Sequence, residues 1–600
     1  MYSEKQTGAP ASRVASLGSD AGARHGASAL PRFPAWIAAL SPPRIALWGL
    51  VAAVVYLTLV PLVMVIYGTF TDGPPGTDAS FTFANYIDAF GGEELYQSGL
   101  NSILFALASG ALSFTVGCFL AWVTERSNAP LKPLIYFLVL VPFVLPGILS
   151  TISWIFLLSP TIGVLNQIVV ATLGLAEPPF NIYTFSGMVW AFGIDHITLP
   201  FFLMAAAFRS MDPSLEEAAT VSGMGPFRTF YYVNLRIMLP SIFAVCLLMF
   251  IRGIETFEAP AVIGLPAGIN LFATEIFLAL RRAPTNYNLA GTYAVAYLAI
   301  TLIGVGLYLR VTRGAERFVM ITGKAYRPRN IDLGPWRFAV TLTSLAILTI
   351  AVVLPLAVVV WTSFMPFYST PSWGMLGLAT LDNYAAIFEL EEFYRASTNT
   401  LITGASAATI AVLLSLGIAW IGIRTDIPGK RLLDMIAFSP IAMPGVVLSL
   451  SLVWVYLTLP IHIYGTLWIL IVAFVTKFIP ISLRIMHVSL LQVHKELEEA
   501  AEIANPSPVR NALFVLLPLI LPGMLVGWLY VLTLTFKDLS IPILLSHVGT
   551  DLLPVLIFGL FQSGELPRLC AMGVLLTLMI AAIAGSTRYL ATRLSVKAGE

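Results

Sequence analysis

The sequence has 600 residues, of which 58% are hydrophobic and only 11% charged, and its formal net charge is +1. Soluble domains use about 25% charged residues, so this composition excludes a soluble globular protein and indicates a chain that lies in a lipid bilayer. The three cysteines, Cys118, Cys246 and Cys570, fall in apolar stretches, where a thiol usually behaves as a small hydrophobe, and their spacing predicts neither a disulfide framework nor a metal site.

The N-terminal segment 1–40 is rich in Gly, Ala and Ser and has no apolar core before Trp36. Its basic residues are Lys5, Arg13, Arg24 and Arg32. We expect a disordered cytosolic tail here. The apolar run that follows is too long for a signal peptide and lacks a clear small-residue cleavage site, so we expect it to be the first membrane span.

Long apolar runs recur along the rest of the chain. A helix needs about 20 mainly apolar residues to cross a hydrocarbon core of about 30 Å. Nine uncharged runs meet this need, at 45–71, 100–124, 133–158, 288–309, 338–364, 396–423, 435–460, 511–536 and 570–587. Three more are short or interrupted by charge: 186–207 with Asp195, 466–483 with Lys477, and the 15 uncharged residues between Arg236 and Arg252. Symmetry between the two halves makes us count all three, so we predict an all-α integral membrane protein with about twelve transmembrane helices.

Charge in the loops predicts the orientation of these spans. With the N-terminus inside, most Lys and Arg residues fall in cytosolic segments, as the positive-inside rule requires. The densest basic cluster joins the two halves and contains Arg310, Arg313, Arg317, Lys324, Arg327, Arg329 and Arg337. We therefore predict a six-helix domain at 41–311, a basic cytosolic linker at 312–337, a second six-helix domain at 338–592 and a cytosolic C-terminal tail at 593–600.

The two halves repeat one pattern. At a single offset of 298 positions, Asn85-Tyr86 matches Asn383-Tyr384, Asn101 matches Asn399, Arg126 matches Arg424, and Pro142, Pro146 and Gly147 match Pro440, Pro444 and Gly445. Because each copy has an even number of crossings, the copies share one orientation, and parallel repeats of this kind place a transport path at their interface. The alternative is a chance fusion of two independent domains. The insertion-free register through the second helix argues against it.

A second match lies in the fourth loop of each half. Residues 214–240 read SLEEAATVSGMGPFRTFYYVNLRIMLP and residues 496–522 read ELEEAAEIANPSPVRNALFVLLPLILP, at an offset of 282 positions. Each copy predicts a short polar helix with a Glu-Ala-Ala face. We expect the helices to stop at Gly223 and Asn505, the two residue types that most readily take the left-handed conformation. An ordinary interfacial helix with a solvated Glu is the alternative, but its occurrence twice in register argues against it.

This Glu-Ala-Ala pattern, followed by three free positions, a Gly and a Leu-Pro, resembles the signature of permease subunits of ABC importers. The resemblance covers nearly the whole chain. Fused twin permeases of the ferric-ion, thiamine and 2-aminoethylphosphonate importers look most similar, and the segment TFKDLSIPILL at 535–545 resembles their second half. The family implies two parallel six-helix permease repeats, in which each short helix docks in a cleft of a cytosolic ATPase.

The residues that the resemblance assigns to ATPase coupling are Glu217, Ala218, Ala219, Gly223 and Leu235 in the first copy and Glu499, Ala500, Ala501, Leu517 and Pro518 in the second. Two departures from the family pattern stand out. The first copy has Leu235-Arg236 where Leu-Pro is expected, and the second copy lacks the Gly. We therefore expect the two halves to couple to the ATPase with unequal strength.

Ionisable residues interrupt several spans, where charge is costly and usually faces a cavity or a partner charge. Asp195 and Lys477 lie at equivalent positions if the offset of 282 extends back into the fourth helices, so we consider an ion pair between them. Each could instead bond a nearby backbone group. The fifth helices carry Arg252, Glu255 and Glu258 in the first half and Lys537 and Asp538 in the second. These five residues could line the translocation path or simply cap helices at the outer interface.

Two other classes of protein are the rivals to this interpretation. A twelve-helix secondary transporter would not require the duplicated fourth loop. A membrane enzyme would need clustered His, Asp or Glu, whereas the six His residues are scattered. No phosphate-binding Gly-x4-Gly-Lys-Ser/Thr loop occurs, so ATP hydrolysis is expected on separate subunits.

We therefore predict a multi-pass permease of a bacterial inner membrane with both termini in the cytosol. The expected partners are two copies of an ABC ATPase, a periplasmic or extracellular substrate-binding protein and the lipid bilayer, with no nucleic acid, no cofactor and no resident metal. The resemblance favours ferric iron as cargo. Thiamine, an aminophosphonate or another small polar solute stays open.

Overall fold

The computed structural model describes residues 42–211, 213–315, 331–504 and 508–599. The predicted tail 1–40 and most of the predicted linker lie outside these residues. The chain divides into two units, residues 1–49 and 50–600. Of the first unit the structure describes only the opening turns of α2 (Pro42–Thr69), and the second unit holds all the other described helices.

Every regular element in the described residues is a helix, and the β-bridges of Thr71 with Phe81 and of Ser127 with Ile331 are isolated. Nine of these helices are long and apolar enough to cross a membrane, at Leu47–Thr69, Glu93–Arg126, Tyr231–Glu255, Tyr287–Thr312, Trp336–Ser363, Glu391–Arg424, Leu467–Leu491, Leu513–Lys537 and Leu566–Ser586. Three bent helix pairs raise the number to twelve if each pair is one span. The predicted all-α integral membrane fold is confirmed.

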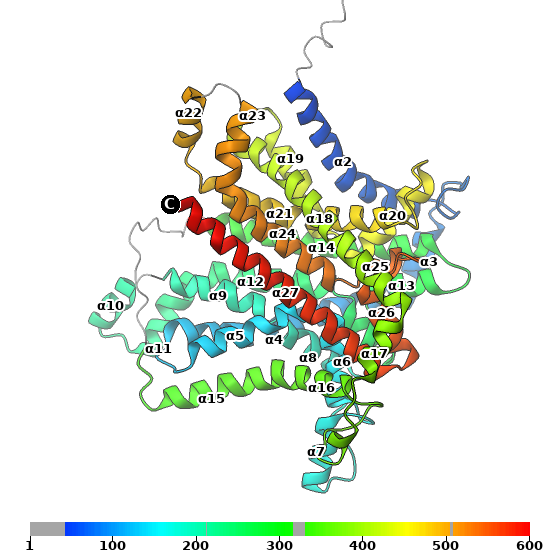
Figure 1. Cartoon of the computed structure of the whole chain (residues 1–600), viewed down its shortest axis with the longest axis vertical. Coiled ribbons are helices and arrows are strands. Elements are labelled where there is room, and N and C mark those ends of the chain that lie inside the picture. Colours follow the sequence, from blue (N-terminus) through cyan, green and yellow to red (C-terminus); the bar gives the residue numbers. More distant parts are fainter. Residues whose placement is uncertain (1–41, 212, 316–330, 505–507, 600) are drawn as a thin grey trace, which may run out of the picture. The chain divides into compact units, whose positions relative to one another are not determined.

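The helices of the first half follow in chain order (Figure 1). They are α3 (Ala84–Gly91), α4 (Glu93–Arg126), α5 (Lys132–Val144), α6 (Gly147–Leu158), α7 (Val164–Leu173), α8 (Phe185–Asp195), α9 (Thr198–Arg209), α10 (Pro213–Val221), α11 (Pro226–Thr229), η1 (Phe230–Asn234), α12 (Leu235–Glu255), η2 (Pro260–Gly264), α13 (Phe272–Arg281) and α14 (Tyr287–Ala315).

The helices of the second half repeat this order. They are α15 (Trp336–Leu348), η4 (Thr349–Val353), α16 (Leu354–Ser363), η5 (Met375–Leu378), α17 (Asp382–Glu389), α18 (Glu391–Arg424), α19 (Lys430–Phe438), η6 (Ser439–Ala442), α20 (Gly445–Thr458), α21 (Leu467–Leu491), α22 (Lys495–Ala504), α23 (Pro508–Asn511), η7 (Ala512–Leu516), α24 (Leu517–Lys537), α25 (Pro542–Leu545), α26 (Leu553–Ser563) and α27 (Leu566–Gly599).

The helix bounds carry the repeat that the sequence predicted. Adding 298 to the bounds of α4, 93 and 126, yields 391 and 424, the bounds of α18. Adding 282 to the bounds of α12, 235 and 255, yields 517 and 537, the bounds of α24. The offset falls by 16, from 298 to 282, between α6 and α8, where the first half carries the extra helix α7. Figure 1 shows α7 projecting from the long helices.

Matched polar residues also make matched contacts. Asn85 donates hydrogen bonds to the carbonyls of Thr69 (2.9 Å) and Thr71 (2.8 Å), at the end of α2. Its equivalent Asn383 donates to the carbonyls of Ser363 (3.0 Å) and Met365 (2.7 Å), at the end of α16. Each Asn therefore satisfies carbonyls that a helix C-terminus leaves without an intrahelical donor.

Three of the predicted spans are broken: 186–207 is bent by 50° between α8 and α9, and two others are bent more sharply. The sequence predicts uninterrupted helices at 133–158 and 435–460, but α5 and α6 meet at 107°, and the α19–η6 segment meets α20 at 110°. Pro146 and Pro444 precede the second helix of each pair, and a proline supplies no N–H to the preceding turn. Conversely, the short stretch between Arg236 and Arg252 and the Lys477 stretch are parts of continuous helices, α12 and α21.

Each half packs its first span against the other half. Gly68 in α2 packs so closely against the indole of Trp454 in α20 that a side chain at position 68 would not fit. On the other side, the Tyr368 hydroxyl, after α16, donates to the carbonyls of Phe156 (3.1 Å) and Ile162 (2.7 Å). The two halves are thus joined by α2 against α20 and by the loop after α16 against the end of α6.

Candidate functional site

The two Glu-Ala-Ala segments form short helices, α10 and α22, at the ends of α9 and α21 (Figure 1). Helix α10 stops where the sequence predicts, because Gly223 takes a positive φ of 79° and the Met224 N–H donates to the Ala219 carbonyl at 3.0 Å. The predicted stop of the second helix at Asn505 lies outside the described residues.

Both short helices turn one face away from the protein. Glu217 and Ala218 are exposed on α10, and Glu499 and Ala500 are exposed at the equivalent positions of α22. One turn after each Glu stands an aliphatic residue with almost no cover, Val221 at 89% exposure and Ile503 at 88%. The outward face therefore joins a carboxylate, a small residue and an apolar side chain in both copies.

The other predicted coupling residues differ in exposure, and Gly223 is exposed like Glu217 and Glu499. Ala219 is buried on the inner face of α10, and Ala501 of α22 is half-buried. Leu235 and Leu517, which begin α12 and α24, are half-buried, whereas Pro518 is exposed. The Glu-Ala-Ala helix is thus two-faced, with its first Ala outside and its second Ala inside.

An ion pair that sequence reasoning missed anchors α10. The guanidinium of Arg126, at the end of α4, bonds the carboxylate of Glu216, and the Arg126 side chain is 2% exposed. The Asn234 amide donates a second hydrogen bond to the same carboxylate oxygen at 3.0 Å. Three helical segments, α4, α10 and η1, therefore meet at one buried carboxylate.

The second half forms the same pair at the equivalent positions, because 126 + 298 is 424 and 216 + 282 is 498. The Arg424 Nε donates to Glu498 Oε1 at 2.8 Å, and its Nη2 donates to the carbonyls of Leu490 (3.1 Å) and Val493 (2.7 Å). Glu498 is more open than Glu216, with side-chain exposures of 26% and 11%. The matched arginines and the matched first Glu of each Glu-Glu pair are the sequence signal for this anchor.

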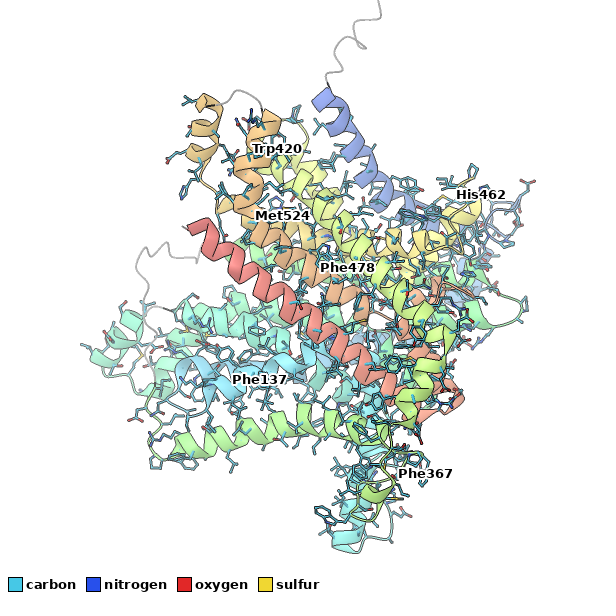
Figure 2. All side chains as sticks on the ribbon, in the orientation of Figure 1. Phe137, Phe367, Trp420, His462, Phe478 and Met524 are labelled. Carbon is cyan, nitrogen blue, oxygen red and sulfur yellow. The ribbon has the colours of Figure 1, made fainter. Side chains whose placement is uncertain are left out.

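A cavity of about 450 Å³ lies between the far ends of the fifth helices, lined by both halves. All seven charged residues singled out in the spans line it: Asp195, Arg252, Glu255, Glu258, Lys477, Lys537 and Asp538. Apolar side chains complete the wall, among them the buried Phe478 of α21, which is labelled in Figure 2. The five fifth-helix residues thus meet at one place rather than at separate helix ends.

The ion pair considered between Asp195 and Lys477 is not formed. Lys477 instead pairs with Asp538 of its own half and donates to the Ser540 hydroxyl at 3.2 Å. Asp195 lies 3.5 Å from His196 Nδ1. The two residues do occupy equivalent positions, since 195 + 282 is 477, but α24 brings an acid closer to the lysine than α8 does.

The remaining charged residues of the cavity have different kinds of partner. Arg252 pairs with Glu255 at 3.2 Å on one turn of α12. Lys537 reaches across to the first half and donates to the carbonyls of Pro142 and Phe143, both at 3.1 Å. Glu258 accepts a long hydrogen bond from the Phe257 N–H at 3.3 Å. Within the described residues, no group of three or more His, Cys, Asp or Glu side chains could hold a metal ion.

Comparison with known proteins matches this architecture. Residues 113–317 match the family of binding-protein-dependent transport system inner membrane components. A ferric transport system permease protein FbpB of Actinobacillus pleuropneumoniae is 24% identical over 542 residues, which cover 90% of this chain and 77% of that protein. The putative ferric transport system permease protein FbpB 1 of Haemophilus influenzae is 27% identical over 347 residues, 57% of this chain and 54% of that protein.

A shorter relative aligns with part of the chain only. The putrescine transport system permease protein PotI of Escherichia coli is 28% identical over 203 residues, 32% of this chain and 71% of that protein. A crystal structure of a bacterial ABC transporter involved in alginate import is 16% identical, with a TM-score of 0.35, and covers 48% of this chain and 93% of that one. The matched domain and the long alignments with ferric transport permease proteins are consistent with a twin-domain inner-membrane permease of an ABC importer, a transporter subunit rather than an enzyme.

Proposed function

We propose that this permease imports ferric iron across the inner membrane, driven by two copies of a cytosolic ABC ATPase that grip α10 and α22. The observation that carries the coupling role is the matched pair of short helices, each anchored by a buried Arg–Glu pair and each presenting an exposed Glu, Ala and aliphatic side chain. Such a face offers a partner both an apolar contact and a directional acceptor for an arginine.

The proposed mechanism is alternating access. Closure of the ATPase pair moves α10 and α22, and the buried Arg126 and Arg424 pass this motion to α4 and α18. One half then rocks against the other around the cavity, which is a two-state change biased at the cytosolic side. In this proposal the domains span 41–311 and 338–592, the termini and the linker 312–337 are cytosolic, and a substrate-binding protein delivers cargo at the opposite face.

Ferric iron is the proposed cargo because three relatives that align with 90%, 57% and 74% of the chain carry ferric transport names. A relative named for 2-aminoethylphosphonate aligns with 31% of the chain, so this solute is the second candidate. The cargo test is uptake of radioactive iron by cells that express this chain with its ATPase and binding protein. We expect excess unlabelled ferric iron to abolish this uptake. If unlabelled 2-aminoethylphosphonate or thiamine abolishes it and ferric iron does not, ferric iron is not the cargo.

The coupling test reverses the two exposed carboxylates. We expect Glu217→Lys with Glu499→Lys to leave membrane insertion and monodispersity unchanged, because both side chains face outward, and to abolish co-purification with the ATPase. Glu177→Lys, an exposed acid in the loop after α7, is the matched control and should change nothing. Normal uptake by the double variant, or solute accumulation by proteoliposomes that hold this chain alone, would disprove the coupling role.

A further inference from the structure

The bend between α5 and α6 leaves backbone acceptors unused. In a continuous helix the carbonyl of residue i accepts from the N–H of residue i+4. The partner of the Pro142 carbonyl would be residue 146, which is a proline and has no N–H. The partner of the Phe143 carbonyl would be Gly147, which begins α6 at 107° to α5. Both carbonyls therefore need donors from elsewhere, since buried backbone groups are almost always paired.

Lys537 supplies both hydrogen bonds from the other half of the chain. Its Nζ lies 3.1 Å from the Pro142 oxygen and 3.1 Å from the Phe143 oxygen, and 5.8 Å from the centre of the Phe143 ring. The ammonium thus sits at the C-terminal end of α5, where the helix dipole favours a cation. The contact joins α24 of the second half to α5 of the first.

Two carboxylates complete the surroundings of this ammonium. Asp195 and Glu258 line the same cavity as Lys537, outside ion-pair distance of its ammonium. Neither carboxylate has a Lys or Arg within ion-pair distance among the residues that the structure describes. Two carbonyl oxygens from the first half therefore hold the ammonium, and two carboxylates of the same half line the cavity around it, which together are groups suited to binding a cation.

The equivalent contact in the opposite direction cannot form. The position equivalent to Lys537 in the first half is 537 − 282, or Glu255, and a carboxylate cannot donate to a carbonyl. Glu255 pairs with Arg252 instead. The broken helix of the second half satisfies the Pro440 carbonyl locally, from the Met443 N–H at 3.0 Å. The cross-repeat contact is thus one-sided.

We propose that the first half carries a cation-binding pocket, formed by the Pro142 and Phe143 carbonyls with Asp195 and Glu258, which the ammonium of Lys537 fills as a tethered plug. The halves separate at this level only when the ammonium withdraws. A cationic cargo drawn to the two carboxylates competes with the ammonium for the two carbonyls, so its arrival favours the withdrawal of the plug. This inference rests on the proposed function of the cavity as the transport path.

The test measures access to the cavity rather than uptake. Leu534, which lines the cavity, is changed to Cys in a chain whose three native cysteines are replaced, and its labelling by a membrane-impermeant thiol reagent is timed. In Lys537→Ala we expect labelling to be about tenfold faster, because hydrogen bonds to a charged group are lost from the closed state. Lys537→Arg should label at nearly the original rate, and Arg568→Ala, which removes an exposed cation of the second half, is the matched control.

Chemical rescue identifies the pocket itself. Added ethylammonium should refill the pocket of Lys537→Ala and return labelling to the slow rate, whereas tetramethylammonium, a cation without an N–H donor, should not. Unchanged labelling in both Lys537→Ala and Lys537→Met, with monodisperse protein, would overturn the plug. Rapid labelling that ethylammonium does not slow would overturn the cation pocket.

The same preparations separate this inference from the proposed function. If Lys537→Ala binds the ATPase normally but labels at the original rate, the plug is wrong and the coupling role stands. If the unaltered chain fails to bind the ATPase while labelling still depends on Lys537, the proposed function is wrong and the plug stands.

Discussion

The two halves of this permease agree at the short helices and differ in the cavity. At the short helices both halves place an arginine from the end of a long helix against the first Glu of the Glu-Glu pair, as Arg126 with Glu216 and as Arg424 with Glu498. In the cavity, two pairs of equivalent positions carry opposite charges. Asp195 corresponds to Lys477, and Glu255 corresponds to Lys537.

Electrostatics explains why the halves differ in the cavity. Two identical halves would face each other with like charges, which repel strongly where water is scarce. Fusion of the halves in one chain frees each copy to change alone, so at these two pairs of positions the first half carries a carboxylate and the second half a lysine. The short helices need no such divergence, because each arginine pairs within its own half.

The largest expected effect tests whether the two Arg–Glu pairs that anchor α10 and α22 contribute equally to stability. Glu216→Gln leaves Arg126 with a buried charge that has lost its counter-ion, and this should destabilise the protein by about 3–5 kcal/mol. Glu498→Gln should cost less, because Glu498 is partly exposed and Arg424 keeps two carbonyl acceptors. Thermal unfolding followed by size-exclusion chromatography measures both losses. Equal losses would contradict the difference in burial.

An intermediate effect tests the pairing within the cavity. Lys477→Met leaves Asp538 without its cation and should cost about 2–3 kcal/mol, less than the loss at Glu216 because Asp538 keeps hydrogen bonds from the Ser540 hydroxyl and the Ile541 N–H. Adding Asp538→Leu should recover most of the loss in a double-mutant cycle. Adding Asp195→Leu instead should recover none of the lost stability. A recovery with Asp195→Leu would show that Lys477 pairs with Asp195 rather than with Asp538.

The smallest effect tests the part of the repeat that has not diverged. Asn85→Ala and Asn383→Ala each remove two hydrogen bonds from the end of a first-span helix and should each cost about 1–2 kcal/mol. We expect similar losses from the two variants, measured by the same unfolding assay. Losses that differ severalfold would show that the two helix ends are not structurally equivalent.

The sequence alone was sufficient for the pattern that repeats along the chain. Apolar runs locate the spans because the bilayer sets their length, and the offsets of 298 and 282 recur in the bounds of the helices. The Glu-Ala-Ala signature located both short helices, and Gly223 ended the first of them as its residue type predicts. Seven charges in apolar surroundings were recognised one by one, and all of them line the cavity.

Only the tertiary structure decided which of these residues meet. The sequence does not distinguish the neighbouring residues Glu216 and Glu217. Helix packing places Glu216 against Arg126 and leaves Glu217 exposed. The sequence offered Lys477 an acid on the equivalent helix, yet the closest carboxylate is that of Asp538. Pairing at these distances depends on how helices far apart in sequence cross and bend. Local patterns predict which residues form each helix, but not which side chain of another helix each one faces.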